Sequence, residues 1–429
     1  MTSADPKRDF AVDVVRTLKE AGFTALWAGG CVRDLLLRNP PDDYDVATSA
    51  RPEEVQKLFG PRRTLAIGAS FGVILVRSPR GGQGGDVEVA TFRTEGPYVD
   101  GRRPEHVSYA TPEEDAHRRD FTINGMFYDP LEDQLHDFVG GRDDIARQLV
   151  RAIGNPQARF TEDKLRMLRA VRISARFDFE LEAATADAVR GMAPEILVVS
   201  QERIAQELKK MLVHPRRARA ISLAHHLELL TIILPELTLV VATAGAAGGA
   251  DRWHLTLETL EILKDPRFEL AFAALLSQIG GPEDDRGSAK LAEVICRRLK
   301  LSNQEADDVA WLASQRSALR GATSWSKCRL KRLLAQPAIG DLLKLARAGA
   351  VAAGSDLTDI AFCEAYLATT PREEIDPPPL ITGDDLVAIG LQPGAQFKEL
   401  LDGARDAQLD SQIQTREEAL ALVRRLAGL

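Results

Sequence analysis

The sequence predicts an α+β protein in which a small mixed-sheet domain precedes an almost wholly helical remainder. Between residues 24 and 93, short apolar segments alternate with glycine turns, which is typical of strands in a small α/β domain. From Gly141 onward, apolar residues recur at helical spacing instead. A chain of 429 residues is also too long for one ordinary hydrophobic core, so we expect several domains.

Local residue patterns define the expected elements and the joints between domains. We expect helices at 9–20, 31–37 and 52–59, and strands at 24–28, 44–47, 64–67, 72–76 and 86–93. A turn is expected at 81–85, and the dense proline and glycine residues of 95–114 predict a mobile surface loop. A Gly- and Ala-rich stretch at 242–250 and three consecutive prolines within 376–380 mark two further joints. We therefore predict domains at 1–140, 141–240, 251–375 and 376–429.

The composition indicates a globular protein and excludes a membrane span. Charged residues make up 28% of the chain and hydrophobic residues 45%, and no apolar run reaches the length of a membrane helix. The polar N-terminus lacks the apolar core of a signal peptide. Four cysteines lie far apart, which favours free thiols in the cytoplasm over disulfides or zinc.

The charge distribution leaves room for a nucleic-acid partner. The net charge of −8 argues weakly against RNA binding, because phosphate contacts need a basic surface. However, residues 141–220 contain 16 Lys and Arg against 11 Asp and Glu. The basic surface can therefore be local, with acidic residues elsewhere.

Asp43 and Asp45 are the most informative residues of the chain. On a strand, two residues at this spacing point to the same face, so their carboxylates can share divalent cations. Mg²⁺ is usually held by one or two carboxylates together with substrate phosphates. Gly29 and Gly30, followed by Arg33, precede them and suit the close approach of a triphosphate. The combination suggests nucleotidyl transfer with two metals, although an isolated Asp-x-Asp usually marks a solvated turn.

The string Gly29-Gly30-Cys31-Val32-Arg33-Asp34, followed by Asp43-Tyr44-Asp45, resembles the start of the class II nucleotidyltransferases. These are the CCA-adding tRNA nucleotidyltransferases and the bacterial poly(A) polymerases. The resemblance implies a polymerase-beta-like head followed by an elongated all-α neck, body and tail. It also implies Mg²⁺ at Asp43 and Asp45 as cofactor, and CTP, ATP and the acceptor arm and 3′ end of tRNA as partners.

The same resemblance points to a third carboxylate and to residues that hold the nucleotide. Glu88 precedes a family-like Val-Ala-Thr-Phe-Arg string and is the expected third catalytic acid, with Asp86 as the alternative on the same face. Arg118 to Met126 looks like a second family motif, which implies that Arg119 contacts the phosphates and Asp120 the ribose hydroxyls. The alternative interpretations are a solvent-facing strand residue for Glu88 and a surface ion pair for Arg119 and Asp120.

Glu162 to Arg172 resembles the family's base-selecting motif. Residues three apart on a helix are neighbours, so we expect Asp163 and Arg166 to lie side by side, with Arg169 and Arg172 continuing a basic stripe. A carboxylate and a guanidinium together match cytosine and adenine, which both offer an amino group beside a ring-nitrogen acceptor. Uracil and guanine present the inverse pattern and would leave both side chains unmatched. An exposed helical salt bridge is the alternative interpretation.

Two further segments resemble parts of this family. Ser200 is expected to cap a helix of structural importance. Ser277-Gln278 replaces the His-Asp pair of a phosphohydrolase helix, so we expect no phosphatase activity. The resulting hypothesis is addition of CCA to tRNA; the alternatives are poly(A) polymerase, a CC-only or A-only enzyme, and a non-catalytic RNA-binding protein.

Overall fold

The computed structural model describes residues 5–68, 72–79, 84–95, 107–243, 251–280 and 285–428. The chain forms two compact units, Met1–Pro235 and Glu236–Leu429. The finer division into four domains stays a prediction. Most of the expected turn at 81–85, of the loop at 95–114 and of the joint at 242–250 lies outside the described residues.

The first unit begins with a seven-stranded mixed sheet in the order β3-β4-β5-β2-β1-β8-β9. Its strands are β1 (Ala25–Ala28), β2 (Asp45–Thr48), β3 (Thr64–Gly68), β4 (Val73–Arg77), β5 (Asp86–Thr91), β8 (Phe127–Asp129) and β9 (Gln134–His136). Strands β2 and β5 are parallel, whereas the other neighbours are antiparallel. In the parallel pair Asp45 lies opposite Glu88. The mixed sheet predicted from the sequence is confirmed.

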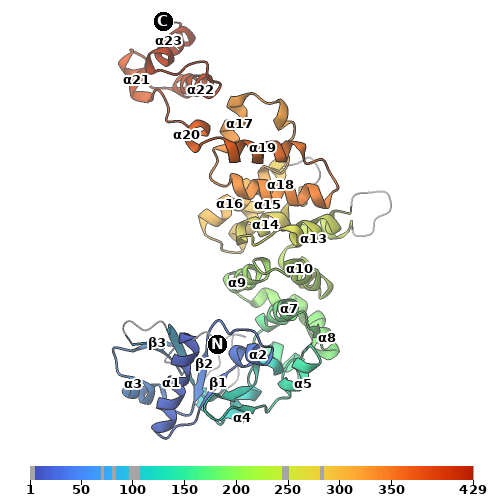
Figure 1. Ribbon diagram of the computed structural model, residues 1–429. Coiled ribbons are helices and arrows are strands. Elements are labelled where there is room, and N and C mark those ends of the chain that lie inside the picture. Colours follow the sequence, from blue (N-terminus) through green and yellow to red (C-terminus); the bar gives the residue numbers. More distant parts are fainter. Residues whose placement is uncertain are drawn as a thin grey trace. The chain divides into compact units, whose positions relative to one another are not determined.

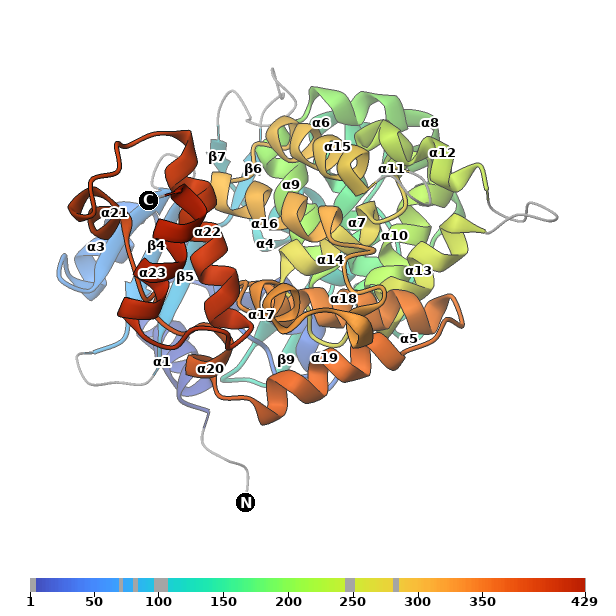
Figure 2. The ribbon, with the colours of Figure 1, turned by 90° about the horizontal axis from the view of Figure 1, so that it is seen from above.

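The helices near the N-terminus lie beside the strands, and the later helices of this unit lead away from the sheet (Figure 1, Figure 2). They are α1 (Pro6–Glu20), α2 (Gly30–Leu36), α3 (Pro52–Phe59), α4 (Pro112–His117), α5 (Gly141–Ala146), α6 (Pro156–Glu162), α7 (Leu165–Phe177), α8 (Ala183–Met192), α9 (Gln201–Leu212), α10 (Arg217–His226) and α11 (Leu229–Ile233). Ser200 stands at the predicted cap of α9, but its side chain makes no capping hydrogen bond.

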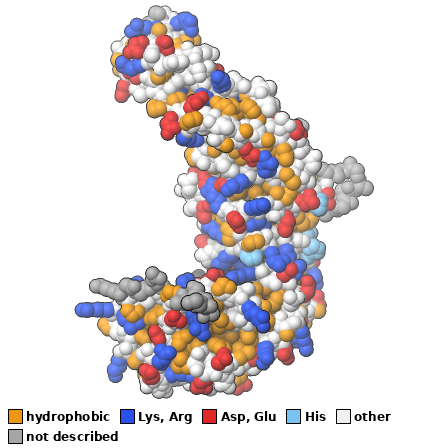
Figure 3. Space-filling model, in the orientation of Figure 1, with side chains coloured by type: hydrophobic (Ala, Val, Ile, Leu, Met, Phe, Trp, Pro, Cys, Tyr) orange, Lys and Arg blue, Asp and Glu red, His pale blue; other side chains and the backbone are white. Residues whose placement is uncertain are grey.

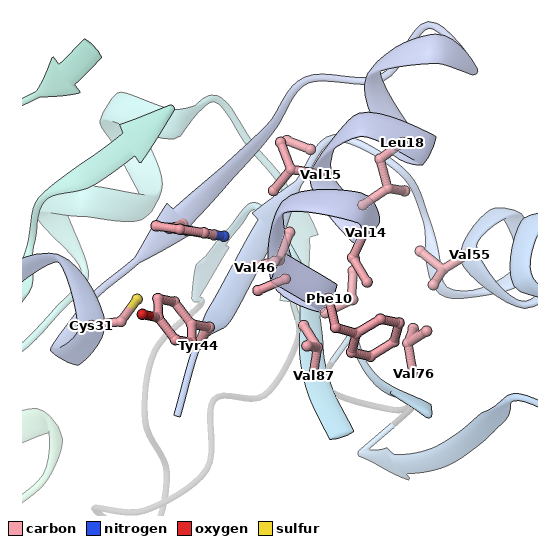
Figure 4. Packing of buried hydrophobic residues seen from close by; sticks show 14 of the residues in the cluster. Phe10, Val14, Val15, Leu18, Cys31, Tyr44, Val46, Val55, Val76 and Val87 are labelled. Carbon is pink, nitrogen blue, oxygen red and sulfur yellow. The ribbon is translucent and has the colours of Figure 1, made fainter. Parts of the chain in front are cut away.

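Helix α1 covers the sheet with one apolar stripe. Phe10, Val14 and Leu18 are spaced by four residues and are all buried, as expected for the core-facing side of an amphipathic helix. They pack with strand residues such as Val46 and Val87 (Figure 4). The helix starts earlier than predicted because the Asp5 side chain accepts hydrogen bonds from the backbone N–H groups of residues 7 and 8.

The prediction of a loop over 95–114 is wrong in its described parts. Strand β6 (Arg93–Glu95) pairs with β7 (Val107–Tyr109), and α4 follows directly. Thr111 and Glu114 form a capping box at the start of α4, with Pro112 in the first turn. The sequence contains this helix-start signal, but the prediction of a loop interpreted Thr111-Pro112 only as a break in regular structure. A second small pair, β10 (Leu149–Val150) with β11 (Glu180–Leu181), is parallel.

All the named elements of the second unit are helical. They are α12 (Thr238–Val241), α13 (Arg252–Ile262), α14 (Phe268–Leu276), α15 (Asp285–Arg298), α16 (Asn303–Ser314), α17 (Lys327–Leu334), α18 (Ile339–Ala352), α19 (Thr358–Thr369), α20 (Arg372–Ile375), α21 (Gly383–Ala388), α22 (Ala395–Leu409) and α23 (Arg416–Ala427). Helix α14 is buried except at Glu269, and Ser277 just after it is also buried. The predicted lack of phosphatase activity stays a prediction. Within the described part of the chain, no helix is both long and apolar enough to cross a bilayer.

Candidate active site

Gly29 lies at a point where only glycine fits. Its φ is +73°, and a Cβ built there would lie 2.9 Å from Arg119 Nη1. Side chains rarely adopt this backbone conformation, and here the space beside the α-carbon is already taken. The turn therefore brings the start of α2 close to Arg119, which lies 90 residues further along the chain.

A basic pocket of about 380 Å³ opens beside this turn. It is lined by Gly29, Gly30, Arg33, Asp45, Arg118, Arg119, Asp120, Asn124, Asp163, Arg166, Arg169, Arg172, Ile173, Arg176 and Phe177. The lining contains seven arginines against three aspartates, so it suits a ligand with several negative charges. All nine residues that we expected at the nucleotide, together with Asp45, meet in this one pocket. Asp43 and Glu88 are not among the described lining residues.

The carboxylates of Asp43, Asp45 and Glu88, on and beside the neighbouring strands β2 and β5, influence one another electrostatically. Burial, together with the negative charges of Glu88 and Asp43, raises the pKa of Asp45 to about 6 against the opposing charge of Arg119. Solvent still reaches one side of the Asp45 side chain. Asp86, the alternative third acid, lies opposite Arg77 of β4 in the sheet register. The register and the charge interaction therefore favour Glu88 as the third carboxylate.

Asp43 does not belong to the strand as we expected, because β2 begins at Asp45. The alternation of exposed and buried side chains nevertheless continues before the strand, because Asp43 and Asp45 are exposed and Tyr44 between them is buried. Asp43 Oδ1 lies 3.9 Å from Lys7 Nζ. Among the described residues, no three His, Cys, Asp or Glu side chains are close enough to hold a metal. The arrangement offers exposed carboxylate oxygens, which are the donors that Mg²⁺ prefers, rather than a preformed cage.

Asp120 is buried at the centre of a hydrogen-bond network. Its Oδ1 accepts from the Phe121 backbone N–H at 2.8 Å and from Asn124 Nδ2 at 3.1 Å, and its Oδ2 accepts from Arg169 Nε at 2.9 Å. Burial alone would raise the pKa of Asp120, but Arg169, Asn124 and Arg166 lower it to about 2. Arg169 Nη2 also lies 2.5 Å from Oδ2, so four donors surround the carboxylate, and a ligand hydroxyl would have to share or replace one of them.

Arg33 extends this network into α2. Its Nη1 donates to Asn124 Oδ1 at 2.6 Å, and its Nε and Nη2 donate to Asp34 Oδ1 at 2.9 and 2.8 Å. Its guanidinium lies 4.3 Å from the centre of the Phe177 ring, a distance typical of a cation–π contact. These contacts hold Arg33 rigidly at the pocket wall.

Asp115 fixes two neighbouring arginines. Arg118 Nε donates to Asp115 Oδ1 at 2.8 Å, and Arg119 Nε and Nη2 donate to Oδ2 at 3.1 and 2.9 Å. Asp115 is 1% exposed, and Oδ1 also accepts from the Arg93 backbone N–H at 3.2 Å. The two guanidinium groups are therefore held side by side at the pocket, and Arg118, which we did not single out from the sequence, belongs with Arg119.

The expected helical pairing of Asp163 with Arg166 is wrong. Helix α6 ends at Glu162, and Asp163 is extended, with a φ of −145°, before α7 begins. Asp163 Oδ1 instead accepts from the Leu165 backbone N–H at 3.0 Å, and Oδ2 accepts from Arg203 Nη2 at 2.7 Å. Arg166 pairs with Glu162 and donates to the Arg159 carbonyl at 3.0 Å. The two side chains still reach the same pocket, Asp163 from the break between the helices and Arg166 from the first turn of α7.

Helix α7 supplies most of the remaining wall. Arg166, Arg169, Arg172 and Arg176 follow one another at helical spacing, which confirms and extends the predicted basic stripe. Arg172 Nε donates to Glu207 Oε2 at 2.6 Å. Arg176 and Phe177 were missed in the sequence, although their positions ten and eleven residues after Arg166 place them on the same face.

Comparisons with known proteins agree with this geometry. The family described as the poly A polymerase head domain matches residues 25–151, and that described as a probable RNA and SrmB-binding site of polymerase A matches residues 178–240. The CCA-adding enzyme of Streptococcus pyogenes is 42% identical over 213 residues, covering 49% of this chain and 51% of that enzyme. The chain thus spans about half the length of the curated relatives it matches.

Solved structures resemble the chain over almost its whole length. A Bacillus stearothermophilus CCA-adding enzyme in complex with CTP has a TM-score of 0.77 at 27% identity, covering 99% of both chains. A Thermotoga maritima CCA-adding enzyme, complexed with tRNA, shares the fold with a TM-score of 0.64 at 21% identity, covering 100% of this chain and 97% of that one. Together with the glycine turn and the basic pocket, these matches show that the chain is similar to CCA-adding enzymes over almost its whole length and to the head domain of poly A polymerases over residues 25–151.

Proposed function

We propose that this protein adds CCA to the 3′ ends of tRNA from CTP and ATP, without a nucleic-acid template. The observation that carries the proposal is one pocket in which Asp45, at the start of β2, faces the same space as Asp163, in the break before α7, and Arg166, in the first turn of α7. One nucleoside triphosphate can therefore contact both groups. The names of the matched relatives support the same activity.

The arginines are proposed to bind the triphosphate. Arg33 and Arg119 line the pocket next to the glycine turn, and both are held in place by carboxylates or amides behind them. A preorganised guanidinium fork binds phosphate with little further loss of entropy. In the reaction, the 3′ oxygen of the RNA forms a bond to the α-phosphorus while the bond to the β-phosphate oxygen breaks and pyrophosphate leaves.

Asp120 and the pair of Asp163 and Arg166 are proposed to recognise the nucleoside. Asp120 lines the pocket, and a ribose hydroxyl that takes the place of one of its Arg169 contacts would favour ribonucleotides. Asp163 accepts the amino proton of cytosine or adenine, and Arg166 donates to the neighbouring ring nitrogen. Because Arg203 and Leu165 already fix Asp163, its orientation does not depend on the ligand.

A divalent cation, which we propose is Mg²⁺, would be held by Asp43 and Asp45 with Glu88 nearby. The pKa of Asp45 is raised first by burial and then by repulsion from Glu88 and Asp43, and a bound cation would offset both effects. When bound, such a cation activates the attacking hydroxyl and stabilises the leaving pyrophosphate. Asp43→Ala should therefore abolish incorporation while leaving the fold intact by circular dichroism. The four free cysteines of the chain are consistent with the cytoplasmic location that we propose.

The decisive experiment is extension of a tRNA that lacks its terminal CCA. The full-length protein is incubated with α-labelled CTP alone, ATP alone and both together, and the products are resolved at single-nucleotide resolution. Two cytidines with CTP alone, and one further adenosine with both, are expected. A product that contains only adenosines would refute CCA addition.

Poly(A) polymerase is the second candidate, because the matched head family carries that description. The same assay separates the two activities. A poly(A) polymerase would extend the RNA by a long run of adenosines, whereas a CC-only or A-only enzyme would stop after one kind of nucleotide.

A further inference from the structure

A second pocket lies next to the first within the same unit. It encloses about 370 Å³ and shares Arg172 and Arg176 with the first pocket. Lys210, His214 and Arg216 contribute from α9 and the turn that follows it, and Met211 and Val213 supply an apolar part of the wall. The described lining contains no carboxylate. Lys, Arg and His side chains lie together over the region of α7, α9 and α10 in Figure 3.

Apart from Arg172, which the buried Glu207 holds at 2.6 Å, the cations of this second pocket have only weak competing partners. Arg216 pairs with Asp178 at 2.7 Å, and Arg176 pairs with Asp42 at 3.6 Å, but these two carboxylate side chains are 44% and 84% exposed. Lys210 Nζ lies 3.6 Å from Oε1 of Glu207; this carboxylate is buried, but the separation is long and the Lys210 side chain is 60% exposed. Exposed ion pairs contribute about 0–1 kcal/mol, so a phosphate can replace such partners at little cost.

His214 adds a neutral donor to this basic wall. Burial and the charges of Arg176, Arg216 and Arg217 lower its pKa, so the ring is neutral at physiological pH. Its Nδ1 accepts from the Arg216 backbone N–H at 3.2 Å. The proton then belongs on Nε2, which is left as a donor.

We infer that the second pocket binds one nucleotide of the acceptor RNA strand, through its backbone phosphate and its sugar. A mixture of cations, one neutral donor and apolar surface suits a nucleotide unit better than a bare anion. Arg176 also reaches Asp42, directly before the proposed catalytic Asp43, so a strand in this pocket leads toward the reacting end. The matched RNA-binding segment, residues 178–240, contains Lys210, His214 and Arg216. The inference rests on the proposed function and specifies where that function takes its RNA.

Three variants of the full-length protein test the inference. Lys210→Ala removes a charge of the pocket and His214→Ala removes its neutral donor. Arg190→Ala is the control, because it removes one positive charge from the exposed surface of α8 outside both pockets. The probe is an RNA minihelix that mimics a tRNA acceptor stem without CCA. Its affinity is measured by filter binding between about 50 and 200 mM KCl, a range over which phosphate contacts weaken strongly, and CTP and pyrophosphate affinities are measured separately by calorimetry.

We expect Lys210→Ala to weaken RNA binding about tenfold and to reduce the slope of log K against log salt by about 1. His214→Ala should weaken RNA binding without changing the slope, because a neutral donor releases no counterion. Both variants should keep the wild-type affinity for CTP, which also reports that they are folded.

Two results would overturn the inference. In the first, Lys210→Ala and His214→Ala both bind RNA as tightly, and with the same salt slope, as Arg190→Ala. In the second, pyrophosphate binding falls while RNA binding does not, which would identify a product site instead. A wild-type protein that binds the minihelix but incorporates no nucleotide would count against the proposed function alone, and the comparison of variants would still decide the second pocket.

Discussion

On the proposed function, replacing Asp163 with asparagine should change which bases the protein accepts. In the structure Asp163 Oδ2 accepts from Arg203 Nη2 at 2.7 Å, so in the variant Asp163→Asn the amide oxygen must turn toward Arg203 to avoid two facing donors. The new amino group then takes the place of Oδ1, so the hydrogen bond from the Leu165 backbone N–H is lost and a donor faces the base. A site built to accept the amino proton of cytosine would present a donor instead, and this donor matches the carbonyl oxygen of uracil.

The size of the effect follows from the loss of one hydrogen bond to a charged group. Such a bond contributes about 1.5–3 kcal/mol, and each 1.4 kcal/mol is a factor of ten. We therefore expect kcat/KM for CTP and ATP to fall about 10- to 150-fold. The ratio of CTP to UTP use should fall at least as far, because UTP gains a matched contact. Loss of the half-buried pair with Arg203 should cost about 1 kcal/mol of folding stability.

The assay is single-nucleotide extension with each of the four triphosphates at limiting concentration. Asp187→Asn, the same change at an exposed position of α8, is the matched control and should behave as the wild type. Thermal unfolding of both variants separates misfolding from altered recognition. If Asp163→Asn keeps the wild-type ratio of CTP to UTP within a factor of two, Asp163 does not recognise the base.

Four further outcomes are expected. Gly29→Ala should destabilise the fold by about 1–2 kcal/mol, measured by urea unfolding, and weaken CTP binding. An alanine at this positive φ is strained, and its methyl group would lie too close to Arg119. Gly125→Ala should cost about 1–3 kcal/mol in the same measurement, since its Cβ would lie 2.7 Å from a packed valine methyl, whereas Gly191→Ala in open space on α8 should stabilise slightly. Asp45→Asn should stabilise the cation-free protein at pH 8 by about 1 kcal/mol after allowance for solvent screening. The reason is that the folded pKa of Asp45 is raised to about 6, so ionisation at higher pH disfavours the folded state. MgCl₂ with CTP should then raise Tm for the wild type but not for the variant. Asp120 has a pKa of about 2 in the folded state against about 3.9 when unfolded, so the stability that it contributes is present above about pH 4 and is lost as the pH falls toward 2. Asp120→Asn should therefore reduce the dependence of the unfolding free energy on pH in that range. An unchanged dependence would contradict this assignment.

Much of the head could be predicted because its patterns are local. Pro52 to Phe59 was predicted with the bounds that the structure has, since a proline in the first turn and a following glycine mark both ends. The third carboxylate needed more than a pattern. Glu88 and Asp86 are equivalent in sequence alternation, and only the parallel register of β5 with β2 puts Glu88 opposite Asp45.

The break at Asp163 shows where local spacing is insufficient. Asp163 and Arg166 have the right spacing for one helix, and neither glycine nor proline interrupts the segment. The side chain of Asp163 bonds the Leu165 N–H, as an aspartate before an apolar helix commonly does. Its tie to Arg203, forty residues away, is a tertiary contact that helical spacing does not reveal.

The hydrogen bonds that run from Asp34 through Arg33, Asn124 and Asp120 to Arg169 have a thermodynamic consequence. Since each member is held by the next, the free-energy effects of replacing two of them should be far from additive. Once Asp120 is lost, removing Asn124 should cost little more. Through this coupling, a nucleotide that binds beside α2 would also change the stability of α7.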